Sequence, residues 1–257
     1  MTPRPDNETG SALALEGLSL RFGALTAVRD VNLAVARGER RAILGPNGAG
    51  KTSLFNAVCG DFIASAGRIL LFGEDVTGLP AHQRTRKGIG RTYQTSLLFD
   101  GLSVRDNLFC ALRGARPKRF SFRPPRASDP DMIETRALAD RMRLSHLIDR
   151  QVSELSHGLR RQLEVGMALA SNPRLLMLDE PAAGLSSAER PELNRLLAEL
   201  PRSLTLILIE HDMDVALPNA DTVAVMKDGA VVVEGTPDQI VDDPLVYEIY
   251  LGKKADA

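Results

Sequence analysis

Eight consecutive residues of this chain have the types and the spacing needed to bind phosphate groups. Residues 45–52 read Gly-Pro-Asn-Gly-Ala-Gly-Lys-Thr, which fits the pattern of a glycine, four residues, and then Gly-Lys-Thr. Glycines let the backbone curl until successive N–H groups point at one anion. We expect Lys51 to reach the β- and γ-phosphates of a nucleoside triphosphate and Thr52 to hold Mg²⁺. The predicted ATP contacts are Gly45, Pro46, Asn47, Gly48, Ala49, Gly50, Lys51, Thr52 and Ser53.

A phosphate-binding loop of this kind lies between a strand and a helix, and the sequence predicts both. Residues 40–44 form a short predicted strand before it, and residues 52–59 form a predicted helix that stops at Gly60. The start of that helix adds unpaired N–H groups and the positive end of its dipole. A plain glycine-rich turn before a helix is the alternative, but the placement of Lys51 and Thr52 favours a phosphate loop.

A pair of acids supplies the second set of candidate residues. Residues 175–178 are four apolar residues, typical of a buried strand, and Asp179 and Glu180 follow them. Because open α/β sheets bind ligands at the carboxyl ends of their strands, we expect Asp179 to hold Mg²⁺ and Glu180 to act as general base toward water. Taken alone, the two acids could equally just open the next loop; the phosphate loop upstream favours the catalytic role.

Two further polar side chains end predicted strands. His211 follows the predicted strand 204–209, where a neutral imidazole could donate to a γ-phosphate oxygen. Gln94 ends the predicted strand 89–94, and its amide could contact Mg²⁺ or the attacking water. A surface position is the more common role for such a glutamine. His82 and His146 are expected to be structural or exposed.

Ser156 precedes a predicted helix over residues 159–170 and is suited to cap it. The same geometry offers a hydroxyl, a free N–H group and a helix dipole to an anion. Both roles remain open from the residues alone, because nothing in one chain indicates whose anion would bind.

Composition limits the class of protein. The chain has 257 residues, a formal net charge of −1 and 44% hydrophobic residues, which suits a large α/β domain and gives no reason to expect nucleic acid as a partner. The first ten residues do not resemble a secretory signal, and the longest apolar runs are of strand length, so we expect a soluble chain. Cys59 and Cys110 are predicted to be buried free thiols.

Predicted strands and helices alternate on both sides of the phosphate loop, which indicates an α/β fold with a largely parallel sheet. Residues 103–155 are predicted to be helical apart from an interruption at 113–128 with six basic residues and no acids. That loop is either simply solvated or lies against lipid headgroups or a membrane protein. The expected division is a tail (1–12), a core (13–94 and 159–257) and a helical subdomain (95–158) that contains the basic insert 113–130.

The phosphate loop, Gln94, the segment 155–158, the acidic strand end and His211 occur in the order found in the ATP-binding cassette family, and the chain resembles that family over residues 13–252. The resemblance implies a P-loop nucleoside triphosphatase fold with an antiparallel β subdomain and an inserted helical subdomain. It also implies a dimer of cassettes that sandwiches two ATP molecules. Ser156, His157 and Gly158 would then face the γ-phosphate bound by Lys51 of the partner subunit, and Phe22 would stack on adenine. Taken alone, Phe22 could equally be a core residue at a strand edge.

Within the family, the chain is similar to ATPase subunits of importers for branched-chain and other hydrophobic amino acids. The motifs that carry this likeness span residues 91–94, 155–158, 179–185, 210–213 and 250–252. The implied function is ATP hydrolysis at the cytoplasmic face of the plasma membrane, with Mg²⁺, a second ATPase subunit, two permease subunits and, indirectly, a solute-binding protein. Importers of urea and short amides share much of the pattern.

Three alternatives and three departures accompany this resemblance. An exporter cassette, a soluble cassette that clamps a macromolecular complex, and a kinase with the same loop are the alternatives; a kinase would leave residues 155–158 and His211 unexplained. His157 and Leu159 replace the third and fifth residues of the general Leu-Ser-Gly-Gly-Gln signature, and Ser186 stands where most cassettes carry Asp. Leu159 removes a polar side chain at the composite site, and Ser186 is expected to weaken communication across the dimer.

Overall fold

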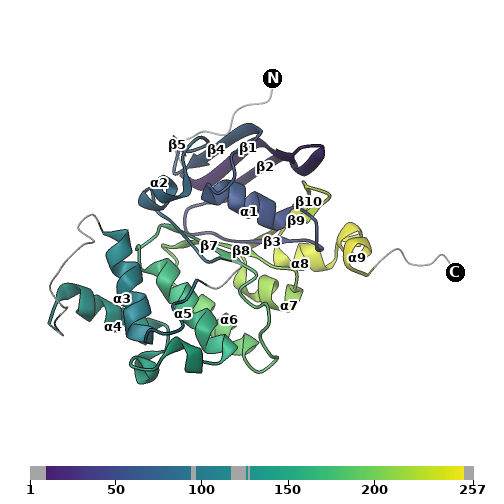
Figure 1. The fold of residues 1–257 in the computed structure, drawn as a ribbon. Helices are drawn as coiled ribbons and strands as arrows, with labels where there is room; N and C mark the ends of the chain where they lie inside the picture. Colours follow the sequence, from purple (N-terminus) through teal and green to yellow (C-terminus); the bar gives the residue numbers. More distant parts are fainter. Residues whose placement is uncertain (1–9, 94–96, 117–125, 127, 252–257) are drawn as a thin grey trace.

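The computed structural model describes residues 10–93, 97–116, 126 and 128–251, and it contains two sheets with helices between and below them (Figure 1). The antiparallel sheet has the order β2-β1-β4-β5. Its strands are β1 (Ser11–Phe22), β2 (Leu25–Ala36), β4 (Ala66–Leu71) and β5 (Glu74–Asp75). Gly23, with φ of 59°, makes the tight turn between the first two strands.

The second sheet has the order β10-β9-β3-β8-β7-β6 and is parallel except for its last hairpin, β9–β10. Every residue of β3, β7 and β8 is buried, which explains why β7 and β8 are nearly continuous apolar runs rather than alternating ones. Strand β3 instead begins with two buried arginines, Arg40 and Arg41. The α/β class and the parallel core predicted from the sequence are confirmed. The strands are β3 (Arg40–Leu44), β6 (Ile89–Arg91), β7 (Leu175–Asp179), β8 (Thr205–Ile209), β9 (Thr222–Lys227) and β10 (Ala230–Gly235).

Helix α1 (Lys51–Cys59) lies between the two sheets (Figure 1). Its apolar side chains, among them Leu54 and Phe55, share one core with β1 and β2 on one side and with Met177 and Ile207 on the other. The helix that starts at the phosphate loop is therefore held from both faces. The remaining helices are α2 (Ala81–Arg86), α3 (Val104–Ala115), α4 (Pro130–Arg141), α5 (His157–Leu169), α6 (Arg190–Ala198), α7 (Met213–Ala216), α8 (Pro237–Val241) and α9 (Pro244–Leu251).

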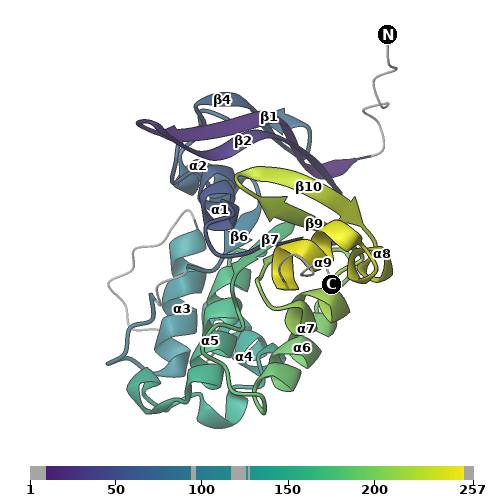
Figure 2. The ribbon, with the colours of Figure 1, turned by 90° about the vertical axis from the view of Figure 1, so that its right-hand side faces the viewer.

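Helices α3, α4 and α5 pack together away from the antiparallel sheet (Figure 2). Buried residues such as Leu108, Met142 and Leu163 form their shared core, which continues under β7 and β8. Helix α5 begins at His157, two residues before the predicted start, because Ser156 already has extended backbone and caps it. Strand β6 ends at Arg91, earlier than predicted. Most of the basic insert lies outside the described residues.

The prediction for one of the two cysteines is wrong. Cys59 is buried, and burial raises the pKa of its thiol to about 12. Cys110, by contrast, is exposed on α3. Leu108 and Leu112 of the same helix face the core, and a position two residues from each lies about 200° around the helix. Among the residues described here, no helix has the length and apolarity needed to cross a bilayer.

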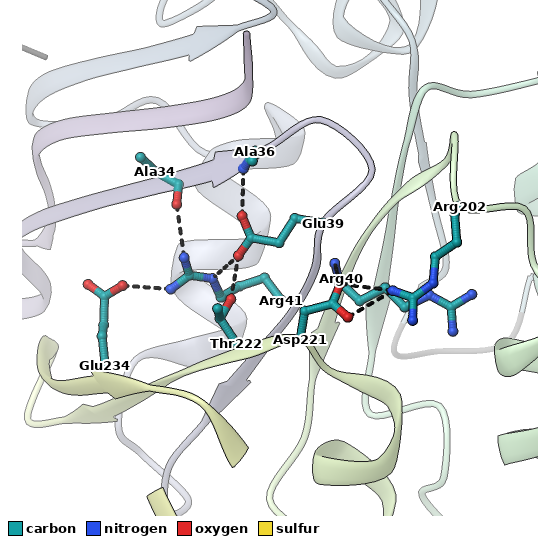
Figure 3. A network of polar contacts seen from close by, with 9 residues as sticks. All are labelled: Ala34, Ala36, Glu39, Arg40, Arg41, Arg202, Asp221, Thr222 and Glu234. Carbon is teal, nitrogen blue, oxygen red and sulfur yellow. Dashed lines mark hydrogen bonds and ion pairs between the residues drawn. The ribbon is translucent and has the colours of Figure 1, made fainter. Parts of the chain in front are cut away.

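A network of charged groups closes the end of the parallel sheet opposite the phosphate loop (Figure 3). Glu39 accepts a hydrogen bond from Arg41 at 2.8 Å, and Arg41 also pairs with Glu234 of β10 at 2.6 Å. Asp221 accepts from the backbone N–H of Arg40 at 2.9 Å. These bonds join the starts of β3 and β9 to the ends of β2 and β10. The carboxyl ends of the parallel strands lie at the opposite edge of the sheet, where the site is. Further partners are Ala34, Ala36, Thr222 and Arg202.

Candidate nucleotide-binding site

The phosphate loop has a backbone that only glycine can supply at two positions. Gly45 and Gly50 have φ of 153° and 97°. A Cβ on Gly45 would lie 2.4 Å from the carbonyl oxygen of Met226, and one on Gly50 would lie 2.3 Å from that of Ala27. The loop therefore packs closely between β9 and β2, and its backbone leads directly into the start of α1. This is an anion-binding geometry.

Lys51 is folded into this loop and is 4% exposed. Its Nζ donates to the carbonyl oxygens of Gly45 at 2.8 Å and Pro46 at 3.1 Å. Burial lowers the pKa of Lys51, while the nearby carboxylates of Glu180, Asp179 and Glu210 act in the opposite direction. The ammonium group is thus already positioned among three acids at the carboxyl ends of β7 and β8.

Asp179, the last residue of β7, is 1% exposed, and its Oδ1 has no hydrogen-bond partner among the described residues. Burial, followed by the charge of Glu180, raises the pKa of Asp179 to about 6, although the Thr52 hydroxyl and Lys51 counteract the rise. A buried carboxylate oxygen without a donor, beside a hydroxyl, suits a hard divalent cation that prefers oxygen ligands. The residues present fit Mg²⁺.

Glu180 and His211 face each other across the ends of β7 and β8. Glu180 Oε1 lies 3.3 Å from His211 Nδ1, and the two side chains are 19% and 49% exposed. The backbone of Glu180 has φ of 46°, in the left-handed region. The two predicted side chains therefore meet at the carboxyl ends of β7 and β8. A water molecule bound there could give its proton to the Glu180 carboxylate, with the His211 imidazole beside it.

Gln94 lies outside the described residues, so its predicted contacts remain predictions. Its neighbour Thr92 is described: the Thr92 hydroxyl accepts a hydrogen bond from the backbone N–H of Asp179 at 3.3 Å. The chain that leads to Gln94 is thereby attached to the acidic strand end.

Phe22 stands at the end of β1 and is 44% exposed. It makes an edge-to-face contact with Phe62, with ring centroids 5.2 Å apart. An exposed aromatic face at this position is available for stacking on a base. The contact with Phe62 was not foreseen, since forty residues separate the two rings in the chain.

The segment 155–158, which we call the signature segment, contacts the loop that follows Glu180. The Ser156 hydroxyl caps α5 by accepting from the N–H of Leu159 at 3.4 Å. The N–H of Gly158 donates to Glu189 Oε1 at 3.1 Å, and His157 Nε2 lies 3.1 Å from the carbonyl oxygen of Ala183.

The two departures next to this segment have roles inside the subunit. Leu159 packs against the helical core, which accounts for an apolar residue there. Ser186 donates its N–H and hydroxyl to Glu189 Oε2 at 3.0 and 2.8 Å. Glu189 thus links Ser186 to Gly158. Its lowered pKa follows from hydrogen bonds from Ser186 first and Gly158 next.

Glu210 is a functional candidate that sequence reasoning left without a role. It is fully buried, its Oε1 accepts from the N–H of Ala182 at 3.0 Å, and burial raises its pKa to about 7. Its position directly after the predicted strand 204–209 could have indicated a role at the site, because the same position after a buried strand singled out Asp179 and Glu180.

A glycine-rich loop between β3 and α1, with acids at the ends of neighbouring parallel strands, defines a P-loop nucleotide-binding fold. The family model described as ABC transporter matches residues 28–183, more than half of the chain. The chain belongs to the ABC transporter family, and it is an ATP-hydrolysing cassette of that family.

Curated relatives and solved structures agree with this assignment. The chain is 39% identical to the high-affinity branched-chain amino acid transport ATP-binding protein BraF of Pseudomonas aeruginosa and to LivG of Escherichia coli K12, over 94% of this chain and 98% of each relative. It is similar to the crystal structure of the ATP-binding cassette MJ1267 in its ADP conformation, with 31% identity, a TM-score of 0.83, and coverage of 95% of this chain and 99% of that one.

Proposed function

We propose that this chain is the ATP-hydrolysing subunit of an importer for branched-chain or other amino acids, or for a related small solute such as urea or an amide. The observation that carries the proposal is 39% identity, over nearly the whole chain, to two proteins named for branched-chain amino acid transport. The geometry at the carboxyl ends of β7 and β8 supports the ATPase chemistry on which such uptake depends.

Thr52 and Asp179 would hold Mg²⁺, with Gln94 as a further proposed ligand. When bound, Mg²⁺ supplies positive charge that neutralises the phosphate oxygens. The N–H groups of the loop 45–50 bind the phosphates, and Lys51 exchanges its hydrogen bonds to Gly45 and Pro46 for phosphate oxygens. Phe22 stacks on the adenine. Most of the acceleration would come from positioning and charge neutralisation.

Glu180 is the proposed general base. Its carboxylate accepts the proton of the water that attacks the γ-phosphorus, and His211, 3.3 Å away, donates to a γ-phosphate oxygen. In the proposed dimer, Ser156, His157 and Gly158 of one subunit complete the site of the other. This assignment gives a role to the exposed Ser156 hydroxyl at the start of α5. The N–H of Gly158 would exchange its hydrogen bond to Glu189 for one to the phosphate.

The proposed partners are a second cassette, two membrane permease subunits and, through them, a solute-binding protein, with the chain attached at the cytoplasmic face of the membrane. A groove between β6 and the helices α3 and α5 is the proposed docking place for the permease. Its lining includes Tyr93, Leu97, Leu98 and Met167. The proposed division into core (13–94 and 159–257) and helical subdomain (95–158) places this groove at their junction.

Affinity purification of the chain from its native membranes in mild detergent, with mass spectrometry of the bound proteins, tests the transport proposal. We expect two polytopic permease subunits and a second cassette. Recovery of only non-membrane proteins, with the same yield of folded chain, would contradict it and leave the ATPase assignment intact.

The substitution Glu180→Gln tests the proposed base. We expect turnover to fall by about 10²- to 10⁴-fold, the usual contribution of general base catalysis, while ATP affinity stays near the wild-type value. Phosphate release and equilibrium ATP binding measure the two quantities. Glu199→Gln, at a carboxylate 58% exposed that pairs with Arg143, is the control. Full turnover by Glu180→Gln would remove Glu180 from the mechanism.

A further inference from the structure

The backbone of the proposed base is held in an unfavourable conformation. Glu180 has φ of 46°, and a non-glycine residue in this region costs about 1–3 kcal/mol unless its surroundings fix it. The N–H of Glu180 donates to the carbonyl oxygen of Ile209 at 2.8 Å, and the N–H of Ala182 donates to Glu210. These bonds satisfy N–H groups of the loop. The carbonyl oxygen of Glu180 also accepts a hydrogen bond from the N–H of Ala183 at 3.0 Å, and the carbonyl groups of residues 179–181 share one further partner.

That partner is Arg161, on the second turn of α5. Its Nε donates to the carbonyl oxygen of Pro181 at 2.8 Å, and its Nη2 donates to those of Asp179 at 2.9 Å and Glu180 at 2.5 Å. The remaining nitrogen, Nη1, pairs with Glu164 at 2.5 Å. Arg161 is only 8% exposed. One buried guanidinium thus binds three successive carbonyl groups, and the middle one belongs to Glu180.

We propose that Arg161 is a positioning residue for ATP hydrolysis, holding the Glu180 carboxylate at the place where it meets the attacking water. The inference rests on the proposed role of Glu180 as base. A planar guanidinium can bind three carbonyl oxygens in a fixed arrangement, whereas an ammonium group on a flexible stem cannot reproduce it. Without Arg161, the three carbonyl contacts that help to fix the left-handed backbone of Glu180 are lost, and the carboxylate shifts with the backbone.

Arg161 also connects this loop to the signature segment. Helix α5 begins directly after Ser156, and Arg161 lies one turn beyond Gly158 on the same rigid element. Helix α5 therefore has two tasks in the proposed mechanism. Its start contacts the nucleotide bound by the partner subunit, and its Arg161 binds the backbone at Glu180 of the same subunit.

The test compares Arg161→Lys and Arg161→Ala with the matched variants Arg160→Lys and Arg160→Ala. Arg160 is the neighbouring residue, and it pairs with exposed Asp100 at 3.2 Å. We expect kcat of both Arg161 variants to fall by about 10- to 100-fold, the effect of misplacing a catalytic group by about 1 Å. The KM for ATP and the affinity for ADP with Mg²⁺ should change by less than about threefold. Free guanidinium should partly restore kcat of Arg161→Ala.

A purely structural role would give another result. In that case the Arg161 variants would lose thermal stability, and fewer molecules would bind nucleotide. Their kcat per nucleotide-binding site would match that of the Arg160 variants, and free guanidinium would not raise it. This outcome would overturn the inference. The Glu180→Gln variant distinguishes failure of this inference from failure of the proposed base. If Glu180→Gln is inactive and Arg161→Lys turns over normally, the inference is wrong and the proposed base stands.

Discussion

At the scale of single residues, the site gathers three acids with different surroundings next to one buried lysine. Asp179 and Glu210 are almost completely buried, whereas Glu180 is partly open. Within the described part of the chain, Asp179 has an oxygen without a donor; Glu210 accepts a hydrogen bond from the backbone at Ala182, and Glu180 contacts His211. Differences in environment therefore assign different tasks to chemically similar groups.

Glu210 leads to a prediction about pH. Burial raises its pKa to about 7 in the folded protein, whereas an unfolded chain has a pKa of about 4.3. The unfolded chain therefore loses its proton first, and the folded state loses stability as pH rises from about 4.5 to about 7. The substitution Glu210→Gln should remove this loss, on the order of 3 kcal/mol. Urea unfolding of both proteins without nucleotide, between pH 5 and pH 8, measures it. Parallel curves across this range would contradict the predicted pKa effect.

The sequence predicted those site residues whose positions follow from local order. Lys51, Asp179 and His211 each adjoin a recognisable strand or helix, so their place at the edge of a parallel sheet could be expected. Arg161 and Glu189 could not be found in this way. Their partners across the site, such as Asp179 for Arg161 and Gly158 for Glu189, lie 18 and 31 residues away. A charged residue near a helix gives no sign of which distant carbonyl or N–H group it will meet.

At the scale of elements, the phosphate loop depends on contacts with both sheets. Gly50 lies against the carbonyl of Ala27 in β2, at a distance that no side chain permits. We expect Gly50→Ala to destabilise the protein by about 2–4 kcal/mol and to weaken ATP binding strongly. Gly101→Ala is the control, because a Cβ there meets nothing within 4 Å. Chemical denaturation and equilibrium ATP binding measure the two effects, and equal stability of the two variants would contradict the argument.

Most elements were predictable from the pattern of apolar residues, and their ends were less so. The buried strands β7 and β8 were predicted within one residue. Helix α5 starts before its apolar pattern does, because the cap at Ser156 determines the start. The exposed side of α3 at Cys110 was missed, since a cysteine in an apolar neighbourhood gives no indication of which way it faces.

At the scale of the whole molecule, the signature segment exposes the Ser156 hydroxyl at the start of α5, which the proposed dimer would place on a second nucleotide. With ATP and Mg²⁺, Glu180→Gln should therefore form a stable dimer, and adding Ser156→Asp should prevent it. Aspartate still caps a helix but puts a negative charge where the γ-phosphate would bind. Thr236→Asp, at the capped start of α8, is the control. Light scattering after gel filtration measures the dimer; dimerisation of the Ser156→Asp variant would argue against this arrangement.

The unequal exposure of the two cysteines has a practical consequence. Cys110 is an exposed residue, although partial burial raises the pKa of its thiol, whereas Cys59 is enclosed and its thiol pKa is raised to about 12. A maleimide dye added to the unaltered protein would therefore attach at one place, on the helical group beside the proposed permease groove. The natural chain thus already carries a single handle for fluorescence or spin-label distance measurements, with which the movement of α3 during an ATP cycle can be followed.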